Sequence, residues 1–316
     1  LTNSYVTSLA VDAADSNTLW VASLARLFKS TDRGQNWSPI PLPPEIGDSP
    51  GSSAYRIVPS PVDPAAILLE LLFGQTWRSR DGGQNWVMAG VTSVASTVVL
   101  KADPLKAATF WAGGYRGLGK STDGGDTWAP QSLPAANAVI FDLAFSPSFP
   151  STVYASGETF NPDLRALLLR SDDAGATWTA AQDGLPAAGI GPLAVDPQHL
   201  ETVYTVTHLS APNYSGDIYK TVNGGSTWSL VNNVFHDRIV QFLAAAPSGV
   251  LYAAVKTDNV YESDDGGLSW APLGESPRPS FFTFLTADPR DPCRVYAGTL
   301  NRGLLAFTKK GTAVCP

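Results

Sequence analysis

Four acidic residues stand where carboxyl groups could act on a bound substrate. Two carboxyl groups held about 5–10 Å apart can serve as acid and base, or as acid and nucleophile, on a glycosidic bond. Asp142 is the first candidate, because its apolar neighbours Phe141, Leu143 and Phe145 could raise the pKa of its carboxyl group. Its expected partners are Glu158, Asp217 and Asp258. The alternative for Asp142 is an ion pair with Arg56 or Lys101, which would be a structural role.

A second set of residues could bind a ligand without a chemical step. Arginine pairs with carboxylates through two parallel hydrogen bonds, and aromatic rings stack on sugars or anchor a protein partner. The ligand-binding candidates are Arg56, Tyr115, Arg116, Phe160, Arg165, His208, Tyr214 and Arg302. The alternative is that the arginines are solvated and balanced by nearby acids, and that several aromatics pack beneath their own loops.

A repeated turn must position all of these residues. The pattern Ser/Thr-x-Asp-x-Gly-x-x-Trp recurs every 42 to 50 residues, beginning at Ser30, Ser79, Ser121, Ser171, Thr221 and Ser263. Its acidic position is occupied by Asp32, Asp81, Asp123, Asp173, Asn223 and Asp265. Glycine supplies the positive φ of a tight turn, the Asp or Asn oxygen accepts N–H groups of the turn, and Trp covers it. Each copy therefore predicts a structural turn between two strands.

The pattern resembles the Asp-box, or bacterial neuraminidase repeat. That repeat is found in sialidases, xyloglucan-degrading endoglucanases, sortilin-type receptors and the photosystem II assembly factor family. The resemblance implies a β-propeller whose boxes stabilise hairpins away from the ligand face. One unit per ~40–50 residues is also the period of a propeller blade.

We therefore expect an all-β fold, a seven-bladed β-propeller of four-stranded antiparallel blades in a single domain spanning residues 1–316. The predicted blades are approximately 1–41, 42–90, 91–134, 135–185, 186–233, 234–275 and 276–316. In each blade, the loops before the first strand and after the second strand share one face, which we call the top face. The boxes lie on the opposite face, the box face. The long top loops expected are Pro41–Ala54, Ser156–Arg165 and His208–Asp217.

The last unit departs from the repeat, because it lacks a box. Cys315 falls where the other units carry Trp, and Cys293 falls in the turn before the unit's second strand. These are the two cysteines of the chain, which predicts a Cys293–Cys315 disulfide that pins the chain end. Two separate buried thiols are the alternative. A disulfide would indicate an extracellular or periplasmic location.

Composition removes several classes of function. The net charge of −7 disfavours broad nucleic-acid binding, which needs a basic surface. No run of 18 apolar residues occurs, so we expect no membrane span. Metal-ligand spacings of Cys and His are missing, and the acidic pairs Asp172-Asp173 and Asp264-Asp265 lie inside boxes. We expect no metal, no cofactor and a monomer.

Two functions remain open. The first is a recognition or scaffold propeller that binds a glycan or a protein through its top-face loops. The alternative is a glycoside hydrolase acting on a polysaccharide or a sialoside with paired carboxylates. The segment Tyr55-Arg56-Ile57-Val58-Pro59 is similar to the Phe/Tyr-Arg-Ile-Pro motif of sialidases, but it has an extra Val and follows the first box. The resemblance to sialidases therefore implies little about activity here.

Overall fold

The computed structural model shows an all-β protein built from antiparallel sheets. It describes residues 5–23, 26–47, 54–71, 74–147, 149, 151–159, 165–187, 189–199, 201–208, 216–274 and 281–309. The first two sheets follow the order of the chain. They comprise β1 (Ser8–Val11), β2 (Leu19–Ser23), β3 (Arg26–Ser30) and β4 (Ser38–Ile40), then β5 (Ala54–Pro59), β6 (Ile67–Leu71), β7 (Gln75–Ser79) and β8 (Val87–Val91). A short helix, α1 (Pro44–Gly47), lies between them.

The middle of the chain forms two sets of four strands that join into one sheet of eight. These are β9 (Ala95–Ala102), β10 (Phe110–Tyr115), β11 (Gly117–Ser121) and β12 (Ala129–Pro130), then β13 (Ala138–Phe145), β14 (Val153–Thr159), β15 (Arg165–Ser171) and β16 (Thr179–Ala180). The register pair that joins the two sets is Tyr115 with Val139.

Two four-stranded sheets and one three-stranded sheet complete the described chain. Their strands are β17 (Gly189–Val195), β18 (Val203–His208), β19 (Ile218–Thr221), β20 (Ser229–Asn232), β21 (Val240–Ala245), β22 (Leu251–Val255), β23 (Val260–Ser263), β24 (Ala271–Pro272), β25 (Phe282–Ala287), β26 (Arg294–Thr299) and β27 (Leu304–Thr308). The third strand of each of the six complete units ends on the Ser or Thr that opens its box, as the repeat predicts.

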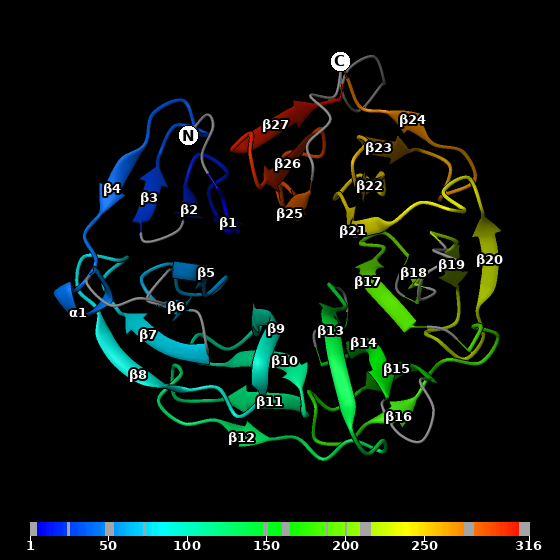
Figure 1. Cartoon of the computed structure of the whole chain (residues 1–316), viewed down its shortest axis with the longest axis horizontal. Coiled ribbons are helices and arrows are strands. Elements are labelled where there is room, and N and C mark those ends of the chain that lie inside the picture. The colour runs from blue at the N-terminus through cyan, green and yellow to red at the C-terminus, as the bar shows by residue number, and fades with distance from the viewer. Residues whose placement is uncertain are drawn as a thin grey trace.

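The sheets stand around a central opening in the manner of a propeller, with the first strand of each unit innermost (Figure 1). Apolar clusters fill the spaces between neighbouring units. One cluster joins Trp20 and Leu27 of the first sheet to Ile57 and Trp77 of the second, and another joins Val6 and Val21 to Tyr296 of the last sheet. Because every unit packs on both of its faces, second strands such as β2, β6 and β22 are buried along their whole length.

The boxes form the same hydrogen-bonded turn in each copy. In the fourth box, Asp173 Oδ1 accepts the Thr177 N–H at 2.8 Å and the Ser171 hydroxyl at 2.8 Å, while Ser171 Oγ accepts the Gly175 N–H at 2.8 Å. Hydrogen bonds from Thr177 and Ser171 hold the pKa of Asp173 at about 2. Asn223 accepts the Thr227 N–H at 3.0 Å in the fifth box, so an amide oxygen serves the same turn.

Each box is also tied to the turn between the first and second strands of its own unit. Five copies donate a backbone N–H to that turn, among them Arg33 to Asn17 O at 3.0 Å and Gly124 to Ala108 O at 2.8 Å. Both turns therefore lie on the box face, which leaves the second-to-third strand loops and the connections between units on the top face.

In three units the residue before the box, Arg78, Lys120 or Arg170, contacts the box of the next unit. Lys120 Nζ donates to Ala174 O at 2.7 Å, and Arg170 Nη1 donates to Gly224 O at 2.9 Å. At the sixth unit the charge is reversed, because Glu262 pairs with Lys309 of the last sheet at 3.5 Å. Through these contacts, the boxes hold neighbouring units together in addition to forming local turns.

The first and last sheets lie side by side in the ring (Figure 1). The Thr283 hydroxyl donates to Val6 O at 2.6 Å, and the Ser16 hydroxyl donates to Asp288. The ring is thus closed here by contacts between two sheets, each made of strands from its own end of the chain.

Gly175 provides a test of the fastening between units. A Cβ atom there would lie 2.1 Å from Cη2 of the buried Trp111 in the preceding unit, at a φ of +88°. Gly175→Ala should lower the free energy of unfolding by roughly 2–4 kcal/mol, the sum of overpacking and left-handed strain. Urea-induced unfolding measures this loss.

The matched control is Gly82→Ala, at a φ of +73° with no heavy atom within 4 Å of the added Cβ. Backbone strain alone should cost about 1 kcal/mol there. Equal losses in the two variants would contradict packing of Gly175 against the preceding unit.

Candidate functional site

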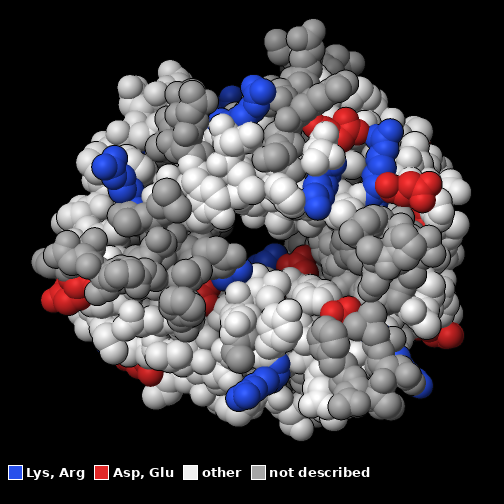
Figure 2. All heavy atoms as spheres, viewed as in Figure 1, with Lys and Arg blue, Asp and Glu red and all other residues white. Residues whose placement is uncertain are grey.

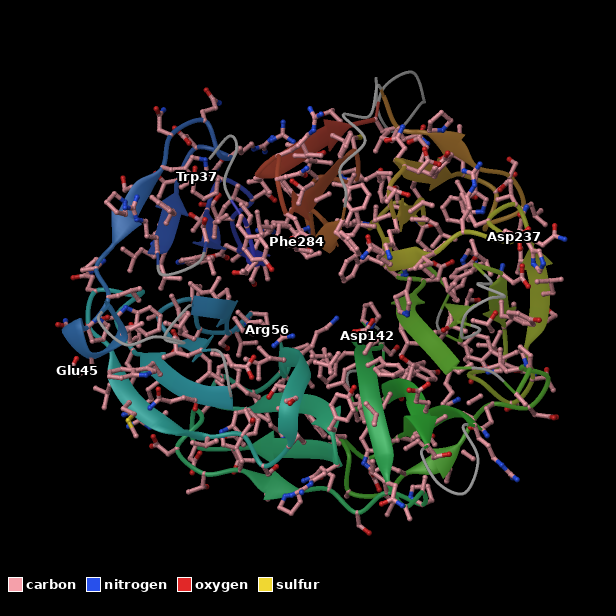
Figure 3. The ribbon with its side chains drawn as sticks, viewed as in Figure 1. Trp37, Glu45, Arg56, Asp142, Asp237 and Phe284 are labelled. Carbon is pink, nitrogen blue, oxygen red and sulfur yellow. The ribbon has the colours of Figure 1, made fainter. Side chains whose placement is uncertain are left out.

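Asp142 lies on the wall of the central opening, and its carboxylate is held by two neighbouring units. Figure 3 shows Asp142 and Arg56 at the edge of the opening, which Figure 2 shows passing between basic and acidic side chains. Lys101 Nζ on β9 lies 3.3 Å from Asp142 Oδ1, and the Leu193 N–H on β17 donates to Oδ2 at 3.0 Å. Asp142 therefore forms the ion pair with Lys101 that was the structural alternative, and its carboxylate connects three units.

Arg56 is bound into the same inner wall. Its guanidinium lies 2.7 Å from Glu70 Oε2 and donates to the carbonyl oxygens of Thr97 at 3.2 Å and Val98 at 2.6 Å in the next unit. The Glu70 side chain is only 1% exposed. Arg56 thus neutralises a buried acid and fastens β5 to β9, and of the two basic partners considered for Asp142 it is Lys101 that forms the ion pair.

Glu158 is the candidate carboxyl group that lies beside an apolar cluster. It lies near the top end of β14, directly opposite Val139 and Ala166. Ala166 belongs to the apolar cluster between this unit and the next. Burial in these surroundings raises the pKa of Glu158, as it would for a general acid.

Asp217 and Asp258 lie farther out on the top face, and each faces a basic group. His236 Nδ1 is 3.0 Å from Asp217 Oδ1, and this hydrogen bond raises the pKa of His236. Arg238 Nη1 is 2.7 Å from Asp258 Oδ2, which also accepts the Tyr261 hydroxyl at 2.8 Å. Three of the four candidate carboxyl groups are therefore engaged by basic side chains in separate places.

Tyr115 and Arg116 line a groove on the top face. The groove has a volume of about 610 Å³, and its walls come from the β10–β11 turn and the connection from β12 to β13. Its lining is Tyr115, Arg116, Gly117, Gln131, Leu133, Ala135, Asn137, Ala138 and Val139. The Tyr115 side chain is 50% exposed. The groove therefore brings together an aromatic ring, a guanidinium group and two amides.

Apart from Tyr115 and Arg116, the residues that line this groove are not predicted from the sequence. Gln131, Leu133 and Asn137 lie in the connection between a box Trp and the next first strand, which carries no motif of its own. The available signal was that Tyr115 and Arg116 stand outside the repeated aromatic and box positions. His236 was likewise not assigned a role from the sequence.

The other ligand-binding candidates are dispersed. Arg165 begins β15, and Arg302 lies exposed in the turn between β26 and β27. The backbone of His208 ends β18, whereas its side chain, Phe160 and Tyr214 lie outside the described residues. Of the three long loops, 48–53, 160–164 and 209–215 also lie outside them. Ile46 in the first loop is fully buried between two sheets, so part of that loop belongs to the core.

Neither a metal centre nor a membrane helix is found in the part of the chain that the structure describes. No group of three or more His, Cys, Asp or Glu side chains there could hold a metal ion. No helix among those residues has the length and hydropathy of a membrane span.

The chain is similar in sequence to a curated protein and similar in fold to several solved structures. No family model matches it. It is 30% identical over 239 residues to a xyloglucanase of Paenibacillus sp., an alignment that covers 72% of this chain and 22% of that protein. The chain thus spans about a fifth of the length of this relative.

Two solved structures show the shared fold. The GH74 enzyme of Niastella koreensis aligns with a TM-score of 0.67 at 17% identity, covering 98% of this chain and 59% of that one. YCF48 from Cyanidioschyzon merolae aligns with a TM-score of 0.70 at 16% identity, covering 97% of this chain and 96% of that one. One of these proteins is named as an enzyme, so the fold by itself does not decide whether this chain is catalytic.

The contacts of Asp142 predict a role in stability. Asp142→Ala should lower the free energy of unfolding by about 1–2 kcal/mol, because the Leu193 N–H loses its acceptor. Asp142→Asn should cost less, because the amide oxygen can still accept that hydrogen bond. Thermal unfolding followed by circular dichroism measures both changes.

The control is Glu201→Ala, which removes an exposed acid from a turn on the box face. It should leave stability within about 0.5 kcal/mol. If Asp142→Ala unfolded at the same temperature as the wild type, the stabilising contact between units that we assign to Asp142 would be wrong.

Proposed function

We propose that this protein is a non-catalytic recognition propeller that binds a polysaccharide in the groove beside Tyr115. The observation that carries the proposal is the groove itself, where an exposed aromatic ring stands beside a guanidinium group and two amides. Sugars are bound by aromatic rings through stacking and by amides and guanidinium groups through hydrogen bonds to hydroxyl groups. The sequence similarity to a protein named xyloglucanase supports a polysaccharide as the ligand class.

The contacts of the carboxyl groups favour binding over hydrolysis. A glycosidase needs two carboxyl groups facing one another across a sugar. Asp142 instead accepts hydrogen bonds within the wall of the ring, and Asp217 and Asp258 face His236 and Arg238. The groove lining contains no carboxyl group.

Hydrolysis remains the second candidate because of Glu158. Its raised pKa suits a general acid, and it lies on the top end of β14 beside an apolar cluster. The similarity to a xyloglucanase and a GH74 enzyme supports this alternative as well. An active enzyme would need a second carboxyl group opposite Glu158, and none of the other three candidates is free of a cationic neighbour.

We further propose seven blades, with β9–β12 and β13–β16 as separate blades. The apolar cluster that contains Trp111 and Leu118 of the first set and Leu167 and Trp178 of the second fills the space between them, as between the other units. The single pair of Tyr115 with Val139 then bridges two blades. An experimental density map with another number of blades would overturn this count.

Tyr115→Ala tests the proposed function. It should weaken binding to a retained polysaccharide roughly 5- to 30-fold, since stacking on an aromatic ring supplies about 1–2 kcal/mol. Affinity electrophoresis against a panel that includes xyloglucan measures binding, and a reducing-sugar assay on the same panel measures turnover. Phe149→Ala is the control, because Phe149 is 49% exposed but lies in a turn on the box face.

The proposal is supported if the wild type binds the polysaccharide without releasing reducing ends, Tyr115→Ala loses this binding, and Phe149→Ala keeps it. Release of reducing ends that Glu158→Gln abolishes would establish the hydrolase instead. Equal binding by the two aromatic variants would exclude the groove as the binding site.

The predicted disulfide and an extracellular location also stand as proposals. Cys315 lies outside the described residues, but Lys309 N donates to Cys293 O at 2.8 Å, so the chain passes Cys293 six residues before Cys315. Alkylation of the denatured protein without reductant should label no thiol. Cys293→Ser should lower stability by about 3 kcal/mol through the open 22-residue loop (315 − 293). Two labelled thiols in the unreduced wild type would contradict the disulfide and the location inferred from it.

A further inference from the structure

The groove beside Tyr115 carries a positive charge on an acidic protein. Arg116 is the charged residue of its lining, and the chain as a whole has a net charge of −7. Among the described residues, no carboxylate forms an ion pair with Arg116, unlike Arg56, Arg170 and Arg238.

The backbone holds Arg116 and Tyr115 firmly at this position. Tyr115 pairs with Ala95 of β9 and with Val139 of β13, so strands on both sides fix the end of β10. Arg116 follows with a φ of 72° and Gly117 with a φ of 99°, which turns the chain back into β11. A left-handed arginine is unusual, and it directs the guanidinium group from the tip of a short turn. A site preorganised in this way loses little entropy when a ligand binds.

The rest of the lining suits a sugar ring. Leu133 and Ala135 pack against the core below and form an apolar floor. Gln131 Nε2 donates to Ala129 O at 3.0 Å, which orients the side-chain amide. Asn137 supplies a second amide at the start of the next blade. Amides can both donate to and accept from sugar hydroxyl groups.

From this arrangement we propose that the groove selects a sugar bearing a carboxylate, a uronic acid unit of an acidic polysaccharide. The proposal rests on the proposed function and names the ligand class of the same groove. Tyr115 stacks on the sugar ring, Arg116 forms a bidentate pair with the carboxylate, and Gln131 and Asn137 bind hydroxyl groups.

The negative charge of the whole protein does not oppose this selection strongly. Exposed charges more than about 8 Å apart are largely screened at physiological ionic strength. Asp217 lies two units away along the chain and Asp258 three units away, and each faces a basic group. Glu158 lies nearer, opposite Val139 of the groove lining, and burial raises the pKa of its carboxyl group. Arg116 is the charged group of the lining itself, so binding of a carboxylate should weaken as salt concentration rises.

Isothermal titration calorimetry tests the selection with matched ligands. Oligogalacturonate and oligoglucuronate are each compared with their carboxyl-reduced, neutral counterparts at low salt concentration. The wild type should bind one of the acidic ligands at least tenfold more tightly than its reduced form. Arg116→Gln should lose that preference while binding the reduced form within about twofold of the wild type.

Arg302→Gln is the control, because Arg302 occupies the corresponding turn of the last sheet, before Gly303 at a φ of 74°, and does not line the groove. It should keep the preference for the acidic ligand. Loss of the preference in both variants would assign it to the overall charge and overturn the proposal.

The outcomes also separate this inference from the proposed function. Suppose that neutral glycans bind, that Tyr115→Ala abolishes this binding, and that the acidic forms bind no more tightly than the neutral ones. The groove is then a glycan site, but the proposed selection of a carboxylate is wrong. If no acidic or neutral glycan binds, the proposed function and the inference both fail.

Discussion

The fold depends on how the backbone N–H groups of a tight turn are satisfied. In each box, a hydroxyl and an Asp or Asn oxygen accept these donors, as Ser171 and Asp173 do for Gly175 and Thr177. The satisfied turn can then pack closely against the preceding unit, where Gly175 meets Trp111 and Lys120 reaches Ala174 O. Replacing glycine would separate the units, so one local requirement sets the spacing of the ring.

The inner wall solves a different problem, because first strands approach one another there without sharing a sheet along their length. Side chains bridge the gaps. Asp142 accepts from Leu193 and pairs with Lys101, Arg56 reaches the carbonyl groups of β9, and Gln241 accepts the Phe282 N–H. A buried or half-buried charge needs a partner, and these contacts between units supply one.

The groove beside Tyr115 lies where β10 contacts β13 of the next unit and the connection from β12 to β13 runs along the top face. Exposed side chains here have no structural task comparable to that of Asp142 or Arg56. The proposed polysaccharide binding and the proposed selection of a carboxylate both depend on these groove side chains, which do not take part in the contacts that repeat between units.

The sequence by itself determined the strands, the turns and their order, because Gly, Asp and Trp at fixed spacing encode local hydrogen bonds that need no distant partner. The ends of the third strands at Ser30, Ser121 and Thr221 follow directly from it. Only the tertiary structure decided what the charged residues do. Arg56 pairs with Glu70 and reaches Val98 O of the next unit, while Asp142 is held by Lys101 and by the Leu193 N–H. The contacts between units depend on how the sheets are packed, which no local pattern of residues encodes.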